Sequence, residues 1–242
     1  MIKQGNQMIE NRLLNALPAV ELDALLAEAG YVSHPLGYEV YREGQTMRAV
    51  LFPRSAVYSV VIDTEPGDRV EAMTVGNEGV VGLSAFMGLL RSPFTIILQV
   101  PGDALQIPLD SFVRLISQNS GLKRLLQRYA TYVFRCISQG LACNTLHTVE
   151  QRACRWLLMA QERAGGPEFM LTQEFLAVML AVSRPTVSSI AQHLQQAGLI
   201  DYRRGVIRVL DAARLEANSC ECYRVIKMFY EEVVVLTDPC TK

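Results

Sequence analysis

Residues 171–198, LTQEFLAVMLAVSRPTVSSIAQHLQQAG, decide the fold. The first ten are typical of a short helix with Thr172 as its N-cap, and a tight connection leads to a second helix capped by Ser183. Pro185 stands in the first turn of that helix, where its missing N–H costs no hydrogen bond, and Gly198 ends it. Two short helices joined by a tight turn predict a helix-turn-helix.

The residues that follow extend this motif. Residues 199–203 and 206–210 are strand-like and flank Arg204-Gly205, so we expect a hairpin, or wing, directly after the second helix. The outer face of that helix carries short hydrogen-bonding side chains and no acid, which suits a DNA major groove; the alternative is an ordinary solvated face. The residues expected to contact DNA are Thr172, Ser183, Arg184, Pro185, Thr186, Ser188, Ser189, Gln192, Arg203 and Arg204.

The first half of the chain has a different pattern. Residues 11–30 predict a helix that Pro18 divides into two short pieces. Residues 31–109 consist of short β-branched and aromatic runs between turn signals, which predicts a β-barrel or sandwich and an α+β chain overall. The clearest strands are 38–41, 56–62, 70–75 and 94–100, and the turns include Pro66-Gly67-Asp68.

A long helix is expected from residue 120 onward. One row of it repeats every three or four residues, as in helices that pack lengthwise, and we interpret this row as a dimer seam: Leu122, Leu126, Tyr129, Val133, Cys136, Gly140 and Cys143. A second apolar row, Ala130, Phe134, Ile137 and Leu141, lies on another face. One row could cover the chain's own barrel while the other meets a partner, or both could form one wide core-facing stripe. A further helix, 146–164, has a basic face of Arg152, Arg155 and Arg163.

The charge is unevenly distributed along the chain. The 242 residues have a formal net charge of −1 and are 50% hydrophobic and 19% charged, which excludes a disordered chain. Residues 1–122 carry a net charge of −5, residues 123–214 of +6 and the rest of −2. This asymmetry is consistent with one segment facing an anion, although small domains often differ by a few charges.

Several other classes of protein are not indicated. Met1–Gln7 begins no secretory signal, and the longest apolar stretch, Gly79–Leu90, is short of the ~20 residues of a membrane span, so we expect a cytoplasmic protein with no membrane contact. No P-loop, G-x-S-x-G or dinucleotide motif suggests an enzyme. The six cysteines lack the spacing of a zinc site, so neither metal nor cofactor is expected. They are Cys136, Cys143, Cys154, Cys220, Cys222 and Cys240.

The helix-turn-helix resembles the winged helix of the cyclic-AMP receptor protein/FNR (CRP/FNR) family of bacterial transcription regulators. The resemblance rests on Leu171-Thr172-Gln173-Glu174, Ala177, Val182-Ser183-Arg184-Pro185-Thr186-Val187-Ser188 and Gly198-Leu199-Ile200. It implies a jelly-roll (cyclic-nucleotide-binding-like) sensor barrel in 1–118, a dimerisation helix in 119–144, and a winged DNA-binding domain with a helical extension in 145–242. It also implies that Arg184 reads a base.

Some positions depart from the family pattern. Pro185 and Ser189 replace a common glutamate and arginine, which implies a different sequence preference. Ala181 replaces a glycine in the turn, so a left-handed conformation there would cost roughly 1–2 kcal/mol and the turn is expected to be reshaped. Cyclic-nucleotide-binding members hold ribose with a glutamate where this chain has Leu83, so cyclic AMP is not expected.

The candidate effector pocket is Gly82, Leu83, Ser84, Arg91 and Ser92, with Arg91 either pairing with an anion or simply lying on the surface. His34, the only histidine in the barrel half, is a weak candidate for a haem ligand, and residues 1–135 hold no cysteine for an iron–sulfur cluster. Cys136 and Cys143 could cross-link a dimer or be small buried residues.

Together these features predict a homodimeric, sequence-specific DNA-binding regulator that recognises a near-palindromic site and responds to an unknown small molecule. An activator role would also require contact with RNA polymerase. The alternative is a ligand-binding or redox-responsive barrel whose helix-turn-helix no longer binds DNA. The arginines at 184, 203, 204 and 208 argue against that alternative because they remain suited to phosphate.

Overall fold

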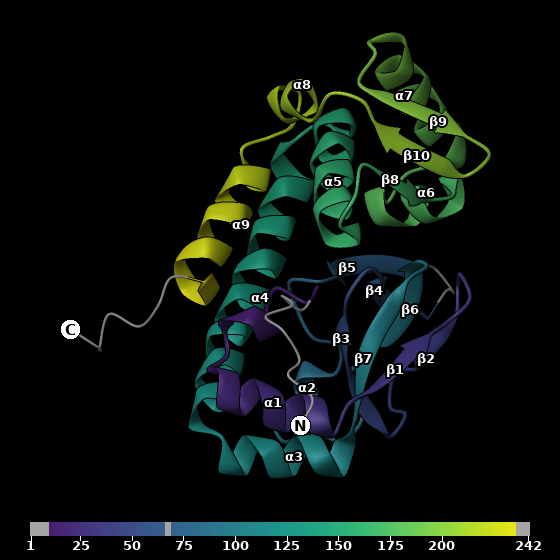
Figure 1. The fold of residues 1–242 in the computed structure, drawn as a ribbon. Helices are drawn as coiled ribbons and strands as arrows, with labels where there is room; N and C mark the ends of the chain where they lie inside the picture. The colour runs from purple at the N-terminus through teal and green to yellow at the C-terminus, as the bar shows by residue number, and fades with distance from the viewer. Residues whose placement is uncertain (1–9, 66–68, 236–242) are drawn as a thin grey trace.

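A computed structural model describes residues 10–65 and 69–235, and the predicted turn at 66–68 and Cys240 lie outside these ranges. A β-barrel and a winged-helix unit lie on one side of a long helix, α4, with α9 along its other side (Figure 1). No single helix of the described residues is long and apolar enough to cross a membrane. The helices are η1 Leu14–Ala16, α1 Ala19–Ala27, α2 Leu83–Phe86, α3 Leu109–Gln118, α4 Ser120–Leu146, α5 Val149–Ala164, α6 Gln173–Leu180, α7 Arg184–Gln196, α8 Ala212–Ala217, α9 Cys222–Tyr230 and the π-helical turn η2 Glu231–Val235.

The barrel consists of two antiparallel sheets that face each other across an apolar core. One sheet has the order β1-β7-β3 and the other β2-β6-β4-β5. Phe52 and Phe112 meet edge to face in this core, with ring centroids 6.3 Å apart. Pro18 separates η1 from α1, as predicted from its fixed backbone angle. The strands are β1 Gly30–Ser33, β2 Glu39–Tyr41, β3 Ala49–Pro53, β4 Val57–Asp63, β5 Arg69–Val75, β6 Thr95–Val100 and β7 Asp103–Pro108.

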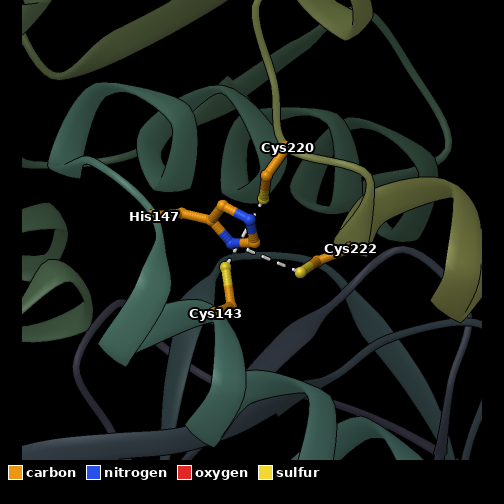
Figure 2. A group of neighbouring side chains, drawn as sticks. All are labelled: Cys143, His147, Cys220 and Cys222. Atoms are coloured by element: carbon orange, nitrogen blue, oxygen red, sulfur yellow. Dashed lines mark hydrogen bonds between the residues drawn. The ribbon is translucent and has the colours of Figure 1, made fainter.

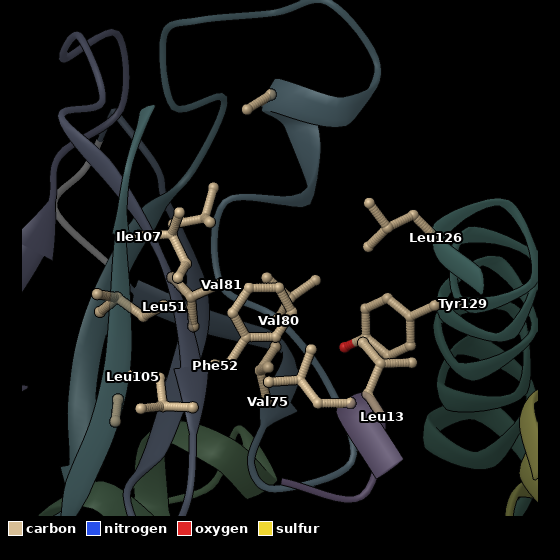
Figure 3. Packing of buried hydrophobic residues seen from close by; sticks show 14 of the residues in the cluster. Leu13, Leu51, Phe52, Val75, Val80, Val81, Leu105, Ile107, Leu126 and Tyr129 are labelled. Carbon is tan, nitrogen blue, oxygen red and sulfur yellow. The ribbon is translucent and has the colours of Figure 1, made fainter. Parts of the chain in front are cut away.

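The row of α4 from Leu122 to Cys143, interpreted above as a dimer seam, packs inside its own chain. This finding corrects that interpretation. Leu126 and Tyr129 are completely buried and point from α4 toward the barrel core (Figure 3). Leu122, Cys136 and Cys143 are buried too, while Val133 and Gly140 are half-buried. The row is periodic because a straight helix lies along a barrel and then along α9, and a helix that packs lengthwise on any neighbour needs such a row.

The second row of α4 is the exposed one. The side chains of Phe134 and Leu141 are 75% and 73% exposed, and that of Ile137 is 42% exposed. Ala130, one turn earlier, is half-buried. An apolar row of this size on a helix surface marks an interaction face.

The winged-helix unit is built around α5. Thr148 caps α5 and exchanges hydrogen bonds with Gln151, which forms a capping box that fixes where the helix begins. The strands of the wing form a sheet in the order β8-β10-β9, from Glu168–Met170, Val206–Val209 and Ile200–Arg203. Strand β8 was not predicted, because three residues directly after Gly165-Gly166-Pro167 are too few for a visible alternation.

Helix α5 also joins the winged-helix unit to the barrel. Arg163 and Glu78 form an ion pair of 2.8 Å, and both side chains are only 4% exposed. Trp156 Nε1 donates a hydrogen bond of 3.2 Å to Glu71 on β5, and burial raises the pKa of that carboxyl. Arg152 is buried as well and donates to the Leu180 carbonyl. The expected basic face of this helix therefore faces inward in large part and is not a DNA surface.

Candidate nucleic-acid interface

Helices α6 and α7 form the predicted helix-turn-helix. They meet at 104°, within the range that is usual for this motif. Thr172 caps α6, and its hydroxyl accepts a hydrogen bond of 3.2 Å from the Phe175 N–H. Ser183 occupies the N-cap position of α7, but its hydroxyl lies 3.0 Å from that of Thr186 and does not accept from the backbone. The N-terminal end of α7 therefore keeps free N–H groups that face outward.

The turn between the two helices is strained at one residue. Ala181 adopts φ 51° and ψ 49°, the left-handed conformation that favours glycine. This conformation lets the Val182 N–H reach back to the Ala177 carbonyl at 3.1 Å and end α6. The turn therefore keeps its left-handed conformation and is not reshaped, which corrects the expectation from the sequence.

The residues predicted to contact DNA share one surface. The side chains of Pro185, Thr186, Ser189 and Gln192 are exposed on α7, opposite the buried residues Val187, Ala191 and Leu194 that hold the helix to the core. Ser188 is half-buried and donates a hydrogen bond of 2.9 Å to Gln173 Oε1. A hollow of about 440 Å³ between α6, α7 and the wing is lined by Thr172, Arg184 and Arg204, among others.

The arginines of this surface differ in their surroundings. Arg184 forms an ion pair of 2.8 Å with Glu174, and both side chains are more than half exposed. Arg203 pairs with Asp201 at 2.9 Å, and Arg208 pairs with Glu168 at 2.6 Å. Within the described part of the chain, Arg204 has no ion-pair partner.

The tip of the wing is a tight turn. Arg204 and Gly205 both have positive φ, 51° and 78°, which is the pattern of the two-residue turn that suits the twist of a β-hairpin. The Tyr202 hydroxyl donates a hydrogen bond of 3.0 Å to the Leu171 carbonyl, and burial raises the pKa of this phenol. The turn therefore holds Arg204 at the exposed tip of the wing, on the hollow that Thr172 and Arg184 also line.

Four of the five predicted effector residues line one cavity. It has a volume of about 380 Å³, lies between the barrel and α4, and is lined by Gly82, Leu83, Ser84 and Ser92. Arg91 is exposed and is not part of the wall, so the structure does not place it against a bound anion. The wall, which lies entirely within the described residues, contains no charged side chain.

His34 and the two cysteines of α4 do not have the surroundings that their expected roles require. His34, considered as a haem ligand, stacks on Tyr38 with ring centroids 4.4 Å apart and does not line the cavity. Cys136 and Cys143 are buried inside the chain, so neither thiol is placed to cross-link two subunits. Burial raises the pKa of the Cys136 thiol to about 11, which keeps it protonated and unreactive.

One group of side chains was missed from the sequence. Cys143 and His147 at the end of α4 lie beside Cys220, just before α9, and Cys222, its first residue (Figure 2). The sequence contains a weak signal, the paired spacings C-x₃-H and C-x-C, but 72 residues separate the two pairs. Cysteine and histidine side chains are metal ligands, and only the fold brings these four together.

Comparison with known proteins finds one family model that matches part of the chain and solved structures with a similar fold. Residues 151–218 match the model of the Crp-like helix-turn-helix domain. FixK2 from Bradyrhizobium japonicum is similar in structure, with a TM-score of 0.68 and 15% identity over 79% of this chain and 98% of that one. The c-di-GMP responsive global regulator CLP from Xanthomonas campestris has a TM-score of 0.63 and 14% identity over 80% and 100% of the two chains.

A transcriptional regulator assigned to the crp/fnr family from Eubacterium rectale has a TM-score of 0.59 and 18% identity over 86% of this chain and 98% of that one. No curated protein matches the sequence. At these low identities the structural likeness concerns the fold, and the similarity in sequence concerns residues 151–218.

The strain at Ala181 leads to a stability prediction. Ala181→Gly removes the clash of the Cβ in the left-handed conformation and should stabilise the protein by about 1 kcal/mol. Ala177→Gly, the same change in the middle of α6, should destabilise it by about 1 kcal/mol. Urea unfolding of both variants tests this, and a destabilised Ala181→Gly variant would contradict the conformation described for the turn.

Proposed function

We propose that this chain, which carries a Crp-like helix-turn-helix domain within the fold of CRP/FNR-family transcription regulators, binds specific DNA sequences as a homodimer and regulates transcription. The observation that carries the proposal is the surface of α7. Its N-terminal end is open, its outer face holds no acidic side chain, and Arg184 stands at its first position. A recognition helix enters the major groove with this end toward the bases.

Arg184 is suited to reading a base. A guanidinium can donate two hydrogen bonds to the O6 and N7 atoms of guanine. In the free protein Arg184 is held by Glu174, but an exposed ion pair contributes at most about 1 kcal/mol, so a guanine can displace it. The short side chains of Thr186, Ser188 and Ser189 let the backbone of α7 approach the groove closely.

The wing supplies contacts with phosphate. Arg204 is exposed, has no ion-pair partner among the described residues, and lines the hollow that α6 and α7 border. Arg203 keeps a long exposed side chain beside Asp201. Arginines at the tip of a hairpin fix the position of a protein on the duplex without reading its sequence.

The exposed row of α4, Ala130, Phe134, Ile137 and Leu141, is the proposed dimer interface. Met87 and Leu89, 63% and 48% exposed, extend this apolar surface at the mouth of the cavity. Two copies that meet along α4 would place two α7 helices on the same side of a duplex. Half-sites about 34–36 Å apart are then expected in a near-palindromic site.

The cavity between the barrel and α4 is the proposed effector site, and its chemistry argues for an apolar, uncharged molecule. Ser92 already donates its hydroxyl to the Phe94 carbonyl at 2.6 Å, and Leu83 offers no acceptor to a ribose hydroxyl. A cyclic nucleotide would bury its phosphate without a cation, which is strongly unfavourable. Phe134 and Ile137 belong both to the wall and to the exposed row, so a bound molecule and a partner subunit would touch the same side chains.

A test of DNA binding begins with selection of bound sequences from a random pool by the full-length protein. Against the selected site, Arg184→Ala should cost roughly 1–3 kcal/mol for each half-site and relax one base position in each. Arg204→Ala should weaken binding equally for all sequences and reduce the salt slope by about two, because each subunit of the dimer loses one phosphate contact. Arg114→Ala, an exposed ion-paired arginine on α3, is the matched control. A pool that enriches no sequence would refute the proposal.

The dimer interface can be tested at a single position. Leu141→Glu places a charge on the exposed row and should convert a dimer into a monomer in sedimentation equilibrium, with an unchanged circular dichroism spectrum. Val20→Glu, a change at an 82% exposed apolar residue of α1, should leave the dimer intact. If both variants remain dimers, the interface lies elsewhere.

The effector site can be tested with an uncharged fluorescent probe, N-phenyl-1-naphthylamine. The wild-type protein should bind the probe with enhanced fluorescence, and cyclic AMP should neither bind in calorimetry nor displace it. Leu83→Trp narrows the cavity and should weaken probe binding at least several-fold, whereas Leu146→Trp, at an exposed residue away from the cavity, should not. Tight binding of cyclic AMP would overturn the argument from the apolar wall.

A further inference from the structure

Three cysteines and a histidine converge where α4 leads into α5, outside the proposed DNA and effector sites. Cys143 lies in the last turn of α4, and His147 directly follows that helix. Cys220 comes from the connection between α8 and α9, and Cys222 is the first residue of α9. One ligand atom from each of the four residues lies within 4.8 Å of every other (Figure 2).

The spacing of the donor atoms fits a single tetrahedral ion. The Cys143 and Cys220 Sγ atoms are 3.5 Å apart, and Cys222 Sγ is 3.6 Å from His147 Nδ1. Zinc bonds of ~2.3 Å to sulfur and ~2.0 Å to nitrogen place tetrahedral ligands roughly 3.3–3.8 Å apart. A cluster of several irons holds its cysteines around a larger core of iron and sulfide and fits this arrangement less well.

The surroundings are those of a structural metal site. Cys143 and Cys222 are fully buried and Cys220 is 3% exposed, so the three sulfurs form a small buried group separate from the two main cores. Four protein ligands would close the coordination sphere, as in Cys₃His zinc sites that stabilise a fold, and leave no position for a substrate.

The neighbouring residues support the same assignment. His147 directs Nδ1 toward Cys222, and its other nitrogen, Nε2, lies 3.3 Å from a Glu221 carboxylate oxygen. A metal-bound histidine usually has such a carboxylate partner, which fixes the ring and its tautomer. Gln139 Nε2 donates a hydrogen bond of 3.1 Å to Cys222 Sγ, a contact that suits a metal-bound thiolate.

We propose that Cys143, His147, Cys220 and Cys222 bind one Zn²⁺ ion, which fastens the C-terminal segment to α4. The ion would tie the beginning of α9 to the end of α4, at the point where α4 leads into α5 and the DNA-binding unit. Two cysteines one residue apart supply one side of the site, and a cysteine and histidine four residues apart on a helix end supply the other. This proposal is independent of DNA binding and of the effector.

The test measures metal content in the full-length protein, purified under reducing conditions without chelator and analysed by inductively coupled plasma mass spectrometry. We expect close to one zinc per chain, and loss of it in Cys143→Ala and Cys222→Ala. Cys136→Ala, seven residues earlier on the same buried row of α4, is the matched control and should keep the zinc. Removal of zinc from the wild-type protein by a chelator should lower its Tm, and added Zn²⁺ should restore it.

Two further measurements keep the proposal testable if a cysteine variant does not fold. Glu221→Gln retains all four ligands and should weaken Zn²⁺ binding by about 10-fold to 100-fold in a competition titration, because it removes the partner of His147. Replacement of zinc by Co²⁺ in the wild-type protein should give the intense visible absorption of a tetrahedral site and a thiolate-to-cobalt charge-transfer band.

Three outcomes would overturn the proposal. The first is a metal-free protein in which peptide mass mapping finds a Cys143–Cys220 disulfide in place of the ion. The second is iron with sulfide, recognised by its visible absorption and by acid-labile sulfur. The third is zinc that Cys136→Ala loses as readily as Cys143→Ala, or a Co²⁺ spectrum of octahedral type.

Discussion

The buried ion pair between Arg163 and Glu78 is the interaction on which the arrangement of this molecule depends. It lies where α5, the barrel and α4 meet, and removing one partner of such a pair typically costs about 3–5 kcal/mol because the other charge stays buried. Gly76 makes the contact possible, since a Cβ there would lie 2.4 Å from Arg163 Cβ. Asn77 adds a hydrogen bond of 3.2 Å to the Glu162 carbonyl. The orientation of the winged-helix unit on the barrel follows from this junction.

The winged helix could be predicted from the sequence because its signals are local. Thr172, Pro185 and Gly198 each begin or end a helix through contacts within one turn of the backbone. The turn of the wing involves only the two residues Arg204 and Gly205. The barrel could be predicted as a class of fold, because each short strand is recognised from its own residues and from the turn residues on either side of it. Its pairing could not, since β1 joins β7 across more than 60 residues.

The remaining features depend on contacts between residues that are far apart in the sequence. Both rows of α4 are apolar, and periodicity does not tell whether a row faces the same chain or a partner; Tyr129 faces the barrel and Phe134 faces outward. Arg163 adds to the positive charge of its segment, yet neutralises a buried glutamate. His147 and Cys220 come together only because α9 runs back along α4.

Helix α4 contributes to three of the features described above. Its 27 residues span about 40 Å and carry a wall of the cavity, the exposed row and Cys143. A helix is stiff to twisting, because each turn is hydrogen-bonded to the next. A rotation of α4 by a few degrees about its axis would therefore turn its whole length, so the cavity wall, the exposed row and Cys143 would all move together.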